Sequence, residues 1–322
     1  MACAPADASP LRLIFFGTPD FALPSLRVLV ESRHEVVGVI TQPDRPRGRG
    51  RKLQPTPVKS LAAELALQVR QPAKVGEQDV LEWMRGLRAD IGVVVAFGQF
   101  IPKSVRELPV QGLINAHASL LPRWRGAAPI QWAILEGDRT TGVSVMRLVK
   151  EMDAGDVCLV RETEIREGET AGQLEPRLAD LAAEALLAAL EEIAAGRAVF
   201  QPQNPDGVME APKINREFAQ LDWSEPVERV LRRIRASSPR PGSDLVLGRA
   251  GVNLRILQAC RSDLDLPLKP GGVRAVEGRL CVAGADGWIE VLRLQAPGKG
   301  PVSAAEYLQG MDIAPDEEVP AR

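Results

Sequence analysis

The chain of 322 residues is poor in histidine and in aromatic side chains, with two histidines, one tyrosine and 4% aromatic residues. A zinc site needs three or four ligands, so two histidines far apart in the sequence predict no metal site. His34 precedes a predicted strand with no acidic or cysteine cluster nearby, and we expect it at the surface. The sequence contains neither a G-x-G-x-x-G fingerprint nor a Walker A sequence, which argues against a nucleotide cofactor site.

The four cysteines form no C-x-x-C pair, and the N-terminus has no basic and apolar leader of the secretory type. We therefore expect reduced thiols and a cytoplasmic protein. No apolar run approaches the ~18 residues that a membrane-spanning helix needs, so we expect no membrane association. Residues 1–10 are expected to form a disordered extension.

The length of the chain exceeds the size at which a single hydrophobic core keeps growing, which predicts two domains. The net charge of only −2 excludes a global attraction to nucleic acid. Any such binding would have to come from a local basic patch. We expect the protein to be a monomer.

Short apolar strands alternate with helical segments through the first part of the chain. We expect strands over 11–16, 36–41, 91–96, 112–116, 141–148 and 156–165. We expect helices over 24–32, 56–67, 127–136 and 174–195. Thr56 is the expected N-cap of the second helix, because a proline follows it at the first helical position. The alternation predicts an α/β domain over 11–198 with a parallel, doubly wound, Rossmann-like sheet.

The composition changes after the long Leu/Ala-rich helix. Pro, Asn, Gln and Gly are frequent over 199–217, which predicts a linker. A helix is expected over 226–236, followed by short apolar strands separated by Gly, Pro and Asp. Residues 218–322 are therefore expected to form a small antiparallel barrel.

Asn115 and His117 end a predicted strand, and Asp153 lies in a Met-Asp-Ala-Gly-Asp turn farther along the chain. An amide and an imidazole can donate hydrogen bonds to a developing oxyanion, and a carboxylate can orient the ring or relay a proton. Ligands of open α/β sheets bind outside the carboxyl ends of the strands. These residues predict an enzyme that carries out acyl transfer. In the simpler alternative, Asn115 and His117 only satisfy loop backbone groups.

Two stretches are rich in basic residues. Five cations lie within residues 45–52, and eight arginines with one acidic residue, Asp244, lie between Arg229 and Arg261. Either stretch could be a solvated surface, but this density of charge favours contacts with the phosphates of a nucleic acid. Few aromatic residues are available for base stacking. The residues expected to make these contacts are Arg45, Arg47, Arg49, Arg51, Lys52, Arg232, Arg233 and Arg235.

Six segments together resemble the methionyl-tRNA formyltransferases. They are FFGTPDFA, TQPDRPRGRGRKLQPTPVK, VVVAFGQFIP, NAHASLLPRWRGAAPIQWAI, TGVSVMRLVKEMDAGDV and APKINREFAQLDWS. The resemblance runs from about Leu11 to about Tyr307. It implies transfer of a formyl group from 10-formyltetrahydrofolate to the α-amino group of initiator methionyl-tRNA, without a metal.

The resemblance also assigns roles by position. It implies that Asn115, His117 and Asp153 are catalytic, and that Arg49 lies in a loop that inserts into the tRNA acceptor stem. The C-terminal region would be an OB-like barrel that contacts the tRNA. The residues expected to contact the folate are Phe97, Ser119, Leu120, Leu121 and Pro122.

Three other functions account for part of the sequence. A formyltransferase acting on an amino-sugar nucleotide or a purine precursor would share the three catalytic residues, but it has no evident use for two basic stretches. A catalytically inactive RNA-binding or folate-sensing module would not need those three residues intact. A nicotinamide dehydrogenase would need the missing glycine fingerprint.

Overall fold

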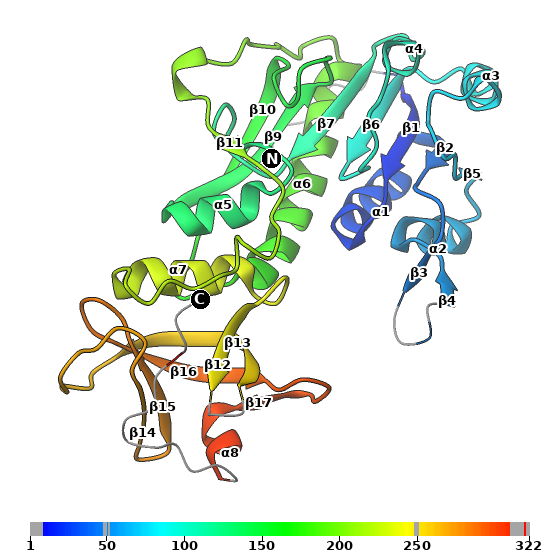
Figure 1. The fold of residues 1–322 in the computed structure, drawn as a ribbon. Helices are drawn as coiled ribbons and strands as arrows, with labels where there is room; N and C mark the ends of the chain where they lie inside the picture. The colour runs from blue at the N-terminus through cyan, green and yellow to red at the C-terminus, as the bar shows by residue number, and fades with distance from the viewer. Residues whose placement is uncertain (1–8, 48–49, 51, 248–250, 310–318, 320–322) are drawn as a thin grey trace. The chain divides into compact units, whose positions relative to one another are not determined.

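A computed structural model describes residues 9–47, 50, 52–247, 251–309 and 319. The chain divides into two compact units (Figure 1). The first unit comprises residues up to 126, 141–163 and 175–210, and the second comprises 127–140, 164–174 and the residues from 211 onward. Residues 1–8 of the expected N-terminal extension lie outside the described part. Within that part, no helix combines the length and apolarity needed to cross a membrane.

The first unit contains a seven-stranded sheet in the order β10-β9-β7-β6-β1-β2-β5 (Figure 1). Its strands are β1 (Arg12–Gly17), β2 (Glu35–Ile40), β5 (Val69–Arg70), β6 (Ile91–Val95), β7 (Leu113–His117), β9 (Thr140–Arg147) and β10 (Val157–Glu164). Strand β1 pairs in parallel with β2 and β6, and β6 pairs in parallel with β7. The Rossmann-like fold predicted from the sequence is confirmed.

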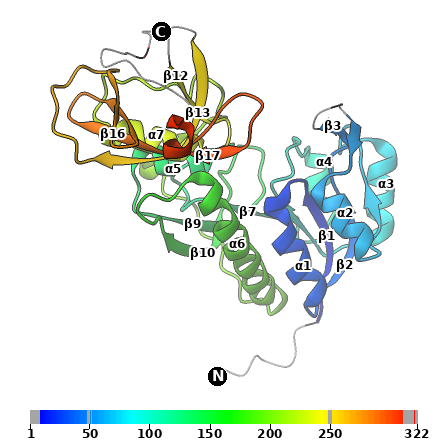
Figure 2. The same cartoon turned by 90° about the horizontal axis from the view of Figure 1, so that it is seen from below.

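Helices cover both faces of this sheet. They are η1 (Asp20–Ala22), α1 (Leu23–Glu31), α2 (Pro57–Glu64), α3 (Gln78–Leu87), α4 (Lys103–Arg106) and α6 (Ala171–Ala194). Helix α3 packs on the face that carries Ile14 and Phe16, and α1 and α6 lie on the other side (Figure 2). Thr56 caps α2 as predicted, because its hydroxyl accepts the Lys59 N–H at 3.1 Å.

Strand β9 departs from the parallel arrangement that the sequence predicted, since it pairs with β7 in the antiparallel sense. The helix between these strands, α5 (Pro129–Glu136), packs against α7 (Val227–Ser237), and both helices belong to the second unit. A parallel return to the sheet requires a crossover connection, usually a helix that covers the sheet. Helix α5 is instead part of the second unit, and the chain re-enters the sheet in the opposite direction.

The basic segment expected as a loop contains a short hairpin. Strand β3 (Arg45–Arg47) pairs with β4 (Lys52–Gln54) in the antiparallel sense. Of the predicted basic contacts, Arg49 and Arg51 lie outside the described residues. Arg45, Arg47 and Lys52 belong to the two paired strands.

The second unit is built on a six-stranded antiparallel sheet, in the order β12-β13-β16-β15-β14 with β17 beside β16. Its remaining elements are β12 (Ser243–Leu247), β13 (Val252–Ser262), β14 (Val273–Val276), β15 (Arg279–Ala283), β16 (Trp288–Gln295), β17 (Pro301–Ser303) and α8 (Ala304–Leu308). Helix α7 buries Val230 and Ile234 in the same core as Leu254 and Val291. The expected small antiparallel barrel is present as this curled sheet.

The segment expected as a linker begins within the first unit, because residues up to 210 belong to that unit. Gln201 pairs with Val157 of β10 through two backbone hydrogen bonds of 2.9 Å. The short elements η2 (Pro205–Gly207) and β11 (Glu210–Ala211) follow. The Arg125 N–H, in β8 (Arg125–Gly126), donates to the Met209 carbonyl at 2.8 Å.

His34 is buried, with 4% of its area exposed, so the surface position expected from the sequence was wrong. Its Nδ1 accepts the Leu11 N–H at 3.1 Å, which leaves the proton of the neutral ring on Nε2. Nε2 lies 3.5 Å from Oε1 of Glu191. Burial lowers the pKa of His34, and the Arg33 charge lowers it further, while Glu191 partly offsets both effects.

This lowered pKa predicts a loss of stability in mild acid. The unfolded histidine takes up a proton near pH 6.5, whereas the folded ring stays neutral to lower pH. The unfolded state then binds more protons, so the free energy of unfolding decreases as the pH falls below about 6.5. Between about pH 7.5 and about pH 5.5, the urea midpoint should fall less in His34→Gln than in the wild type. Equal decreases in both proteins would contradict this role for His34.

Candidate active site

Asn115 and His117 lie at the carboxyl end of β7, two residues apart, so both side chains leave the same face of the sheet. They are nearly enclosed, with 9% and 6% of their areas exposed. Among the hydrogen bonds between described residues, none involves the Asn115 side chain. Its amide is therefore available to donate to a ligand atom.

The His117 ring is held on two sides. Its Nε2 lies 2.8 Å from the Trp124 carbonyl, and because a carbonyl can only accept, Nε2 carries a proton. Its Nδ1 lies 3.6 Å from Oδ2 of Asp153. A proton gained at Nδ1 would turn the second contact into an ion pair. The geometry thus brings together His117 and Asp153 as the sequence predicted.

Asp153 lies in the turn between β9 and β10, in the left-handed backbone region with φ of +50°. Its Oδ2 accepts the Gly126 N–H at 2.9 Å, and 14% of its side chain is exposed. Within the described part of the chain, Oδ1 takes part in no hydrogen bond. This oxygen can therefore accept a proton from a substrate.

The segment Ser119–Pro122 forms a turn directly after β7. Ser119 is fully buried, and its hydroxyl donates to the Arg123 carbonyl at 2.6 Å. The Ser144 hydroxyl donates to the Ser119 carbonyl at 2.7 Å and accepts the Leu121 N–H at 3.0 Å. The Ser119 side chain thus shapes the turn, and the three partly exposed residues after it are better placed to touch a ligand.

Phe97 follows β6, and its ring belongs to the core. It is 2% exposed and lies edge-to-face on Phe16, with 5.6 Å between the ring centroids. Any contact of Phe97 with folate would therefore come from its backbone. The Gln42 amide donates to the carbonyls of Phe97 at 3.2 Å and Gly98 at 2.6 Å, and its oxygen accepts from Arg45 at 2.6 Å. Gln42, which the sequence analysis missed, joins this loop to the β3–β4 hairpin.

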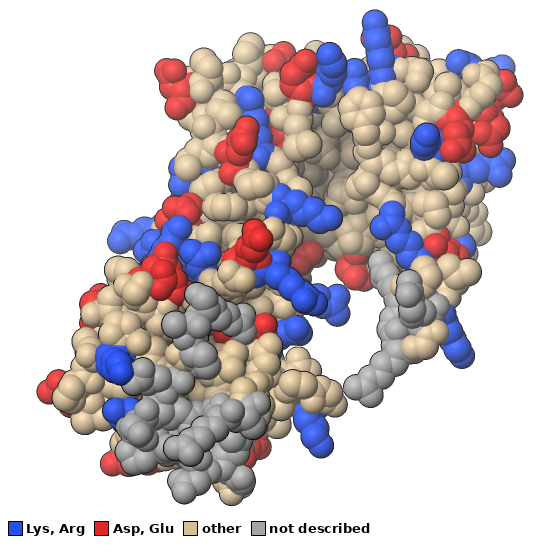
Figure 3. Space-filling view, in the orientation of Figure 1, with Lys and Arg blue, Asp and Glu red and all other residues tan. Residues whose placement is uncertain are grey.

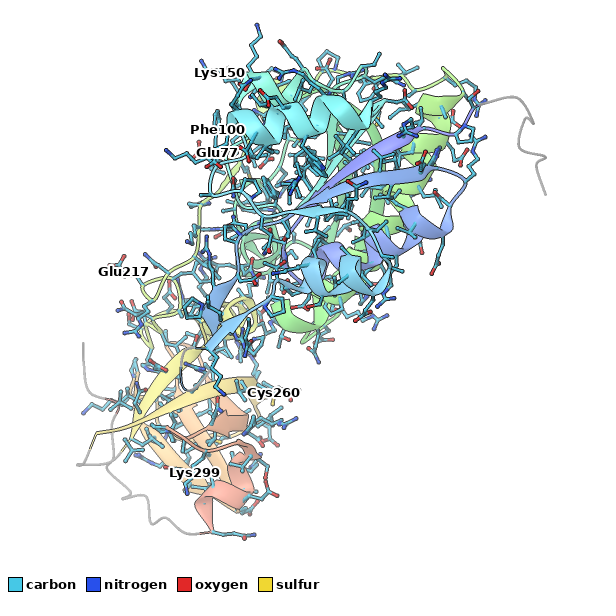
Figure 4. All side chains as sticks on the ribbon, turned by 90° about the vertical axis from the view of Figure 1, so that its right-hand side faces the viewer. Glu77, Phe100, Lys150, Glu217, Cys260 and Lys299 are labelled. Carbon is cyan, nitrogen blue, oxygen red and sulfur yellow. The ribbon has the colours of Figure 1, made fainter. Side chains whose placement is uncertain are left out.

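Two exposed apolar side chains lie in the loops that follow β6 and β9. Phe100 is 73% exposed and Met152 is 72% exposed. Phe100 is labelled in Figure 4, as is Lys150, which lies two residues before Met152. Exposed side chains of this size are suited to packing against an aromatic ligand. Nothing in the sequence marks these two residues beyond their position next to the two strand ends.

Two cations of the β3–β4 hairpin, Arg45 and Lys52, lie at the surface. Arg47 pairs with Lys52 at the end of β3. Leu53, next to Lys52, is 71% exposed. The hairpin therefore offers positive charge together with an apolar side chain.

The arginines expected to bind nucleic acid on α7 are engaged within the second unit. Arg232 and Arg235 pair with the same carboxylate, Glu228, at 3.2 Å and 2.7 Å. Arg233 donates to the Phe218 carbonyl at 3.1 Å. The side chains of Arg233 and Arg235 are only 17% and 18% exposed. Figure 3 shows acidic and basic groups mixed over the region of α7, so phosphates would have to compete with internal partners there.

The chain is similar in sequence to formyltransferases along nearly its whole length. A family model described as formyl transferase matches residues 11–190, and a model of the formyl transferase C-terminal domain matches 213–312. The methionyl-tRNA formyltransferase of Methylobacterium nodulans is 43% identical over 308 residues, which are 95% of this chain and 98% of that one. The enzyme of the same name from Halorhodospira halophila is 45% identical over 309 residues, covering 96% and 99%.

Solved structures share the fold at lower identity. The N-formyltransferase from Helicobacter canadensis, in complex with folinic acid and dTDP-3-aminofucose, has a TM-score of 0.67 at 17% identity and covers 89% of this chain and 99% of that one. HypX from Aquifex aeolicus, in complex with tetrahydrofolic acid, has a TM-score of 0.64 at 22% identity and covers 93% and 47%. Proteins with different names thus share this fold, whereas the relatives at 43–45% sequence identity are both named methionyl-tRNA formyltransferase. The chain belongs to the formyl transferase family and, within it, to the methionyl-tRNA formyltransferases.

Proposed function

We propose that this protein transfers the formyl group of 10-formyltetrahydrofolate to the α-amino group of initiator methionyl-tRNA. Membership of the methionyl-tRNA formyltransferases is the observation that carries this function. The product, N-formylmethionyl-tRNA, serves translation initiation. We expect the enzyme to act as a monomer in the cytoplasm, where its tRNA substrate is found.

Asn115 is our candidate for stabilising the formyl oxygen. When the amine attacks the formyl carbon, this oxygen gains negative charge, and the Asn115 amide can donate to it without losing an internal partner. One preorganised donor of this kind typically contributes ~3–4 kcal/mol. His117 could supply a second donor only by releasing the Trp124 carbonyl or by turning away from Asp153.

Asp153 and His117 are our candidates for moving protons. The attacking nitrogen must lose a proton, and the folate nitrogen that leaves must gain one. Oδ1 of Asp153 is the open acceptor, and the other carboxylate oxygen lies 3.6 Å from Nδ1 of His117. The two groups can therefore share a proton between carboxylate and ring. General acid–base catalysis of this kind usually contributes ~10²–10⁴-fold.

The β3–β4 hairpin is our candidate for tRNA contact, because Arg45 and Lys52 are exposed and the hairpin lies in the same unit as the three catalytic residues. The α7 arginines are weaker candidates, since carboxylates and carbonyls already hold them. The turn at Ser119–Pro122 and the backbone after β6 are proposed to hold the folate. Both follow strand ends of the parallel part of the sheet.

The first test is the reaction itself. Incubation with 10-formyltetrahydrofolate and charged initiator methionyl-tRNA should yield formylmethionine on that tRNA alone. Uncharged initiator tRNA and charged elongator tRNA are the controls. An amino-sugar nucleotide offered as acceptor tests the nearest alternative, and its formylation in place of the tRNA would contradict the proposal, as would the absence of any product.

Removing the Asn115 amide or the His117 imidazole from β7 should reduce turnover. We expect Asn115→Ala to lower kcat by about 10²–10³-fold, because it deletes a donor to the oxyanion. His117→Ala should also collapse turnover while leaving the Kd for tRNA nearly unchanged. Asn253→Ala, at an exposed position on β13, is the matched control. A variant with near-normal kcat would exclude the substituted residue from the mechanism.

Neutralising Arg47, Arg49 and Arg51 to Gln should weaken tRNA binding and flatten its dependence on salt. Each lost phosphate contact reduces the slope of log K against log salt by about one. The control carries the same change of charge at exposed positions elsewhere in the first unit, Lys74, Arg85 and Lys103. If both triple variants show the same slope as the wild type, the hairpin does not contact the tRNA backbone.

A further inference from the structure

Gln203 lies after α6, outside every motif that the sequence analysis considered. Its Nε2 donates to the carbonyls of Asp153 and Gly155, each at 2.8 Å. Its Oε1 accepts from Nε of Arg125 at 3.0 Å and from Nη2 at 2.7 Å. A side-chain amide has two N–H donors and an oxygen with two lone pairs, so all four positions are used. The orientation of the amide is therefore fully determined by its partners.

Arg125 is flanked by the two residues whose backbones hold the catalytic pair. The Trp124 carbonyl accepts from the His117 ring, and the Gly126 N–H donates to the Asp153 carboxylate. Gln203 joins this segment to the turn that carries Asp153. A closed ring thus runs through Asp153, Gln203, Arg125 and Gly126, and His117 is attached to it through Trp124. A shift of either segment would change the separation of carboxylate and imidazole.

The turn that carries Asp153 needs such support. Asp153 lies in the left-handed backbone region, which residues other than glycine adopt infrequently. Gly155 lies so close to the Arg147 carbonyl that an added Cβ would be 1.9 Å from its oxygen. Two carbonyls of this turn accept from a single side chain, and polar backbone groups that lose their donors destabilise the conformation that exposes them. Gln203 therefore favours the conformation that aims the Asp153 carboxylate.

We propose that Gln203 is a positioning residue for formyl transfer, which sets the distance and direction of the Asp153 carboxylate relative to His117 through Arg125 and the backbone of the turn. The inference rests on the proposed function and on the roles of those two residues. Gln203 acts through other groups, so its loss should reduce the rate of the chemical step more than the binding of either substrate.

The test compares Gln203→Leu with the wild type in single-turnover formylation, over a range of pH and with both substrates saturating. We expect the rate to fall by about tenfold to a hundredfold, as a misplacement of about 1 Å can produce, with KM for both substrates within about twofold. The pH at which the rate is half-maximal should also move. Gln201→Leu is the matched control, because that side chain is exposed two residues away. A merely structural role would lower the thermal stability without moving the pH profile.

A double-mutant cycle supplies a second measurement. Arg125→Lys keeps the charge but loses the parallel donors that Gln203 accepts. Arg125 and Gln203 are proposed to act through the hydrogen bonds between them. The single-turnover rate of the double variant with Gln203→Leu should therefore be no lower than that of the more impaired single variant. Gln203→Glu, which keeps an acceptor for Arg125 but has no N–H for the two carbonyls, replaces the leucine variant if that variant does not fold.

The results separate the inference from the function on which it rests. An inactive wild type would contradict the proposed function and not the role of Gln203. With an active wild type, a Gln203→Leu rate and pH profile equal to those of the wild type would overturn the inference. Losses that simply multiply in the double variant, or an equal loss in Gln201→Leu, would overturn it as well.

Discussion

The backbone of residues 124–126 is the constraint on which the site depends. One carbonyl of this segment holds a ring nitrogen of His117, and one N–H holds an oxygen of Asp153. Gly126 adopts φ of +128°, a conformation that L side chains rarely adopt. Because the backbone of an ordered segment reorients less readily than a side chain, the pair is arranged before a substrate arrives. Such preorganisation is a large part of what an active site contributes to a rate.

Much of the fold and the centre of the site could be predicted because they depend on local signals. Strands β6 and β7 are buried along their whole length, so they appear in the sequence as apolar runs of the right length. Asn115 and His117 stand out because they interrupt such a run at its carboxyl end. The cap at Thr56 was predictable for the same reason, since a hydroxyl before a proline is a local pattern.

The features that the sequence did not reveal depend on partners far along the chain. Strand β9 runs antiparallel, and the helix before it, α5, packs against α7, some 90 residues later in the sequence. His34 is buried, and its ring accepts the N–H of Leu11, 23 residues earlier. A count of charges predicted nucleic-acid contacts on α7, but it did not show that Glu228 holds two of the arginines there. Gln203 resembles any polar residue in a Pro- and Asn-rich segment until its hydrogen bonds to Arg125 and to the turn of Asp153 are seen.

The most direct test of this account is a crystal structure of the enzyme with a stable formyl-folate analogue. We expect the formyl oxygen to lie about 3 Å from the amide nitrogen of Asn115, within hydrogen-bond distance. His117 should still donate to the Trp124 carbonyl, and Oδ1 of Asp153 should face the position of the incoming amine. A structure in which the His117 ring has left that carbonyl to bind the formyl oxygen, with Asn115 turned away, would contradict the account.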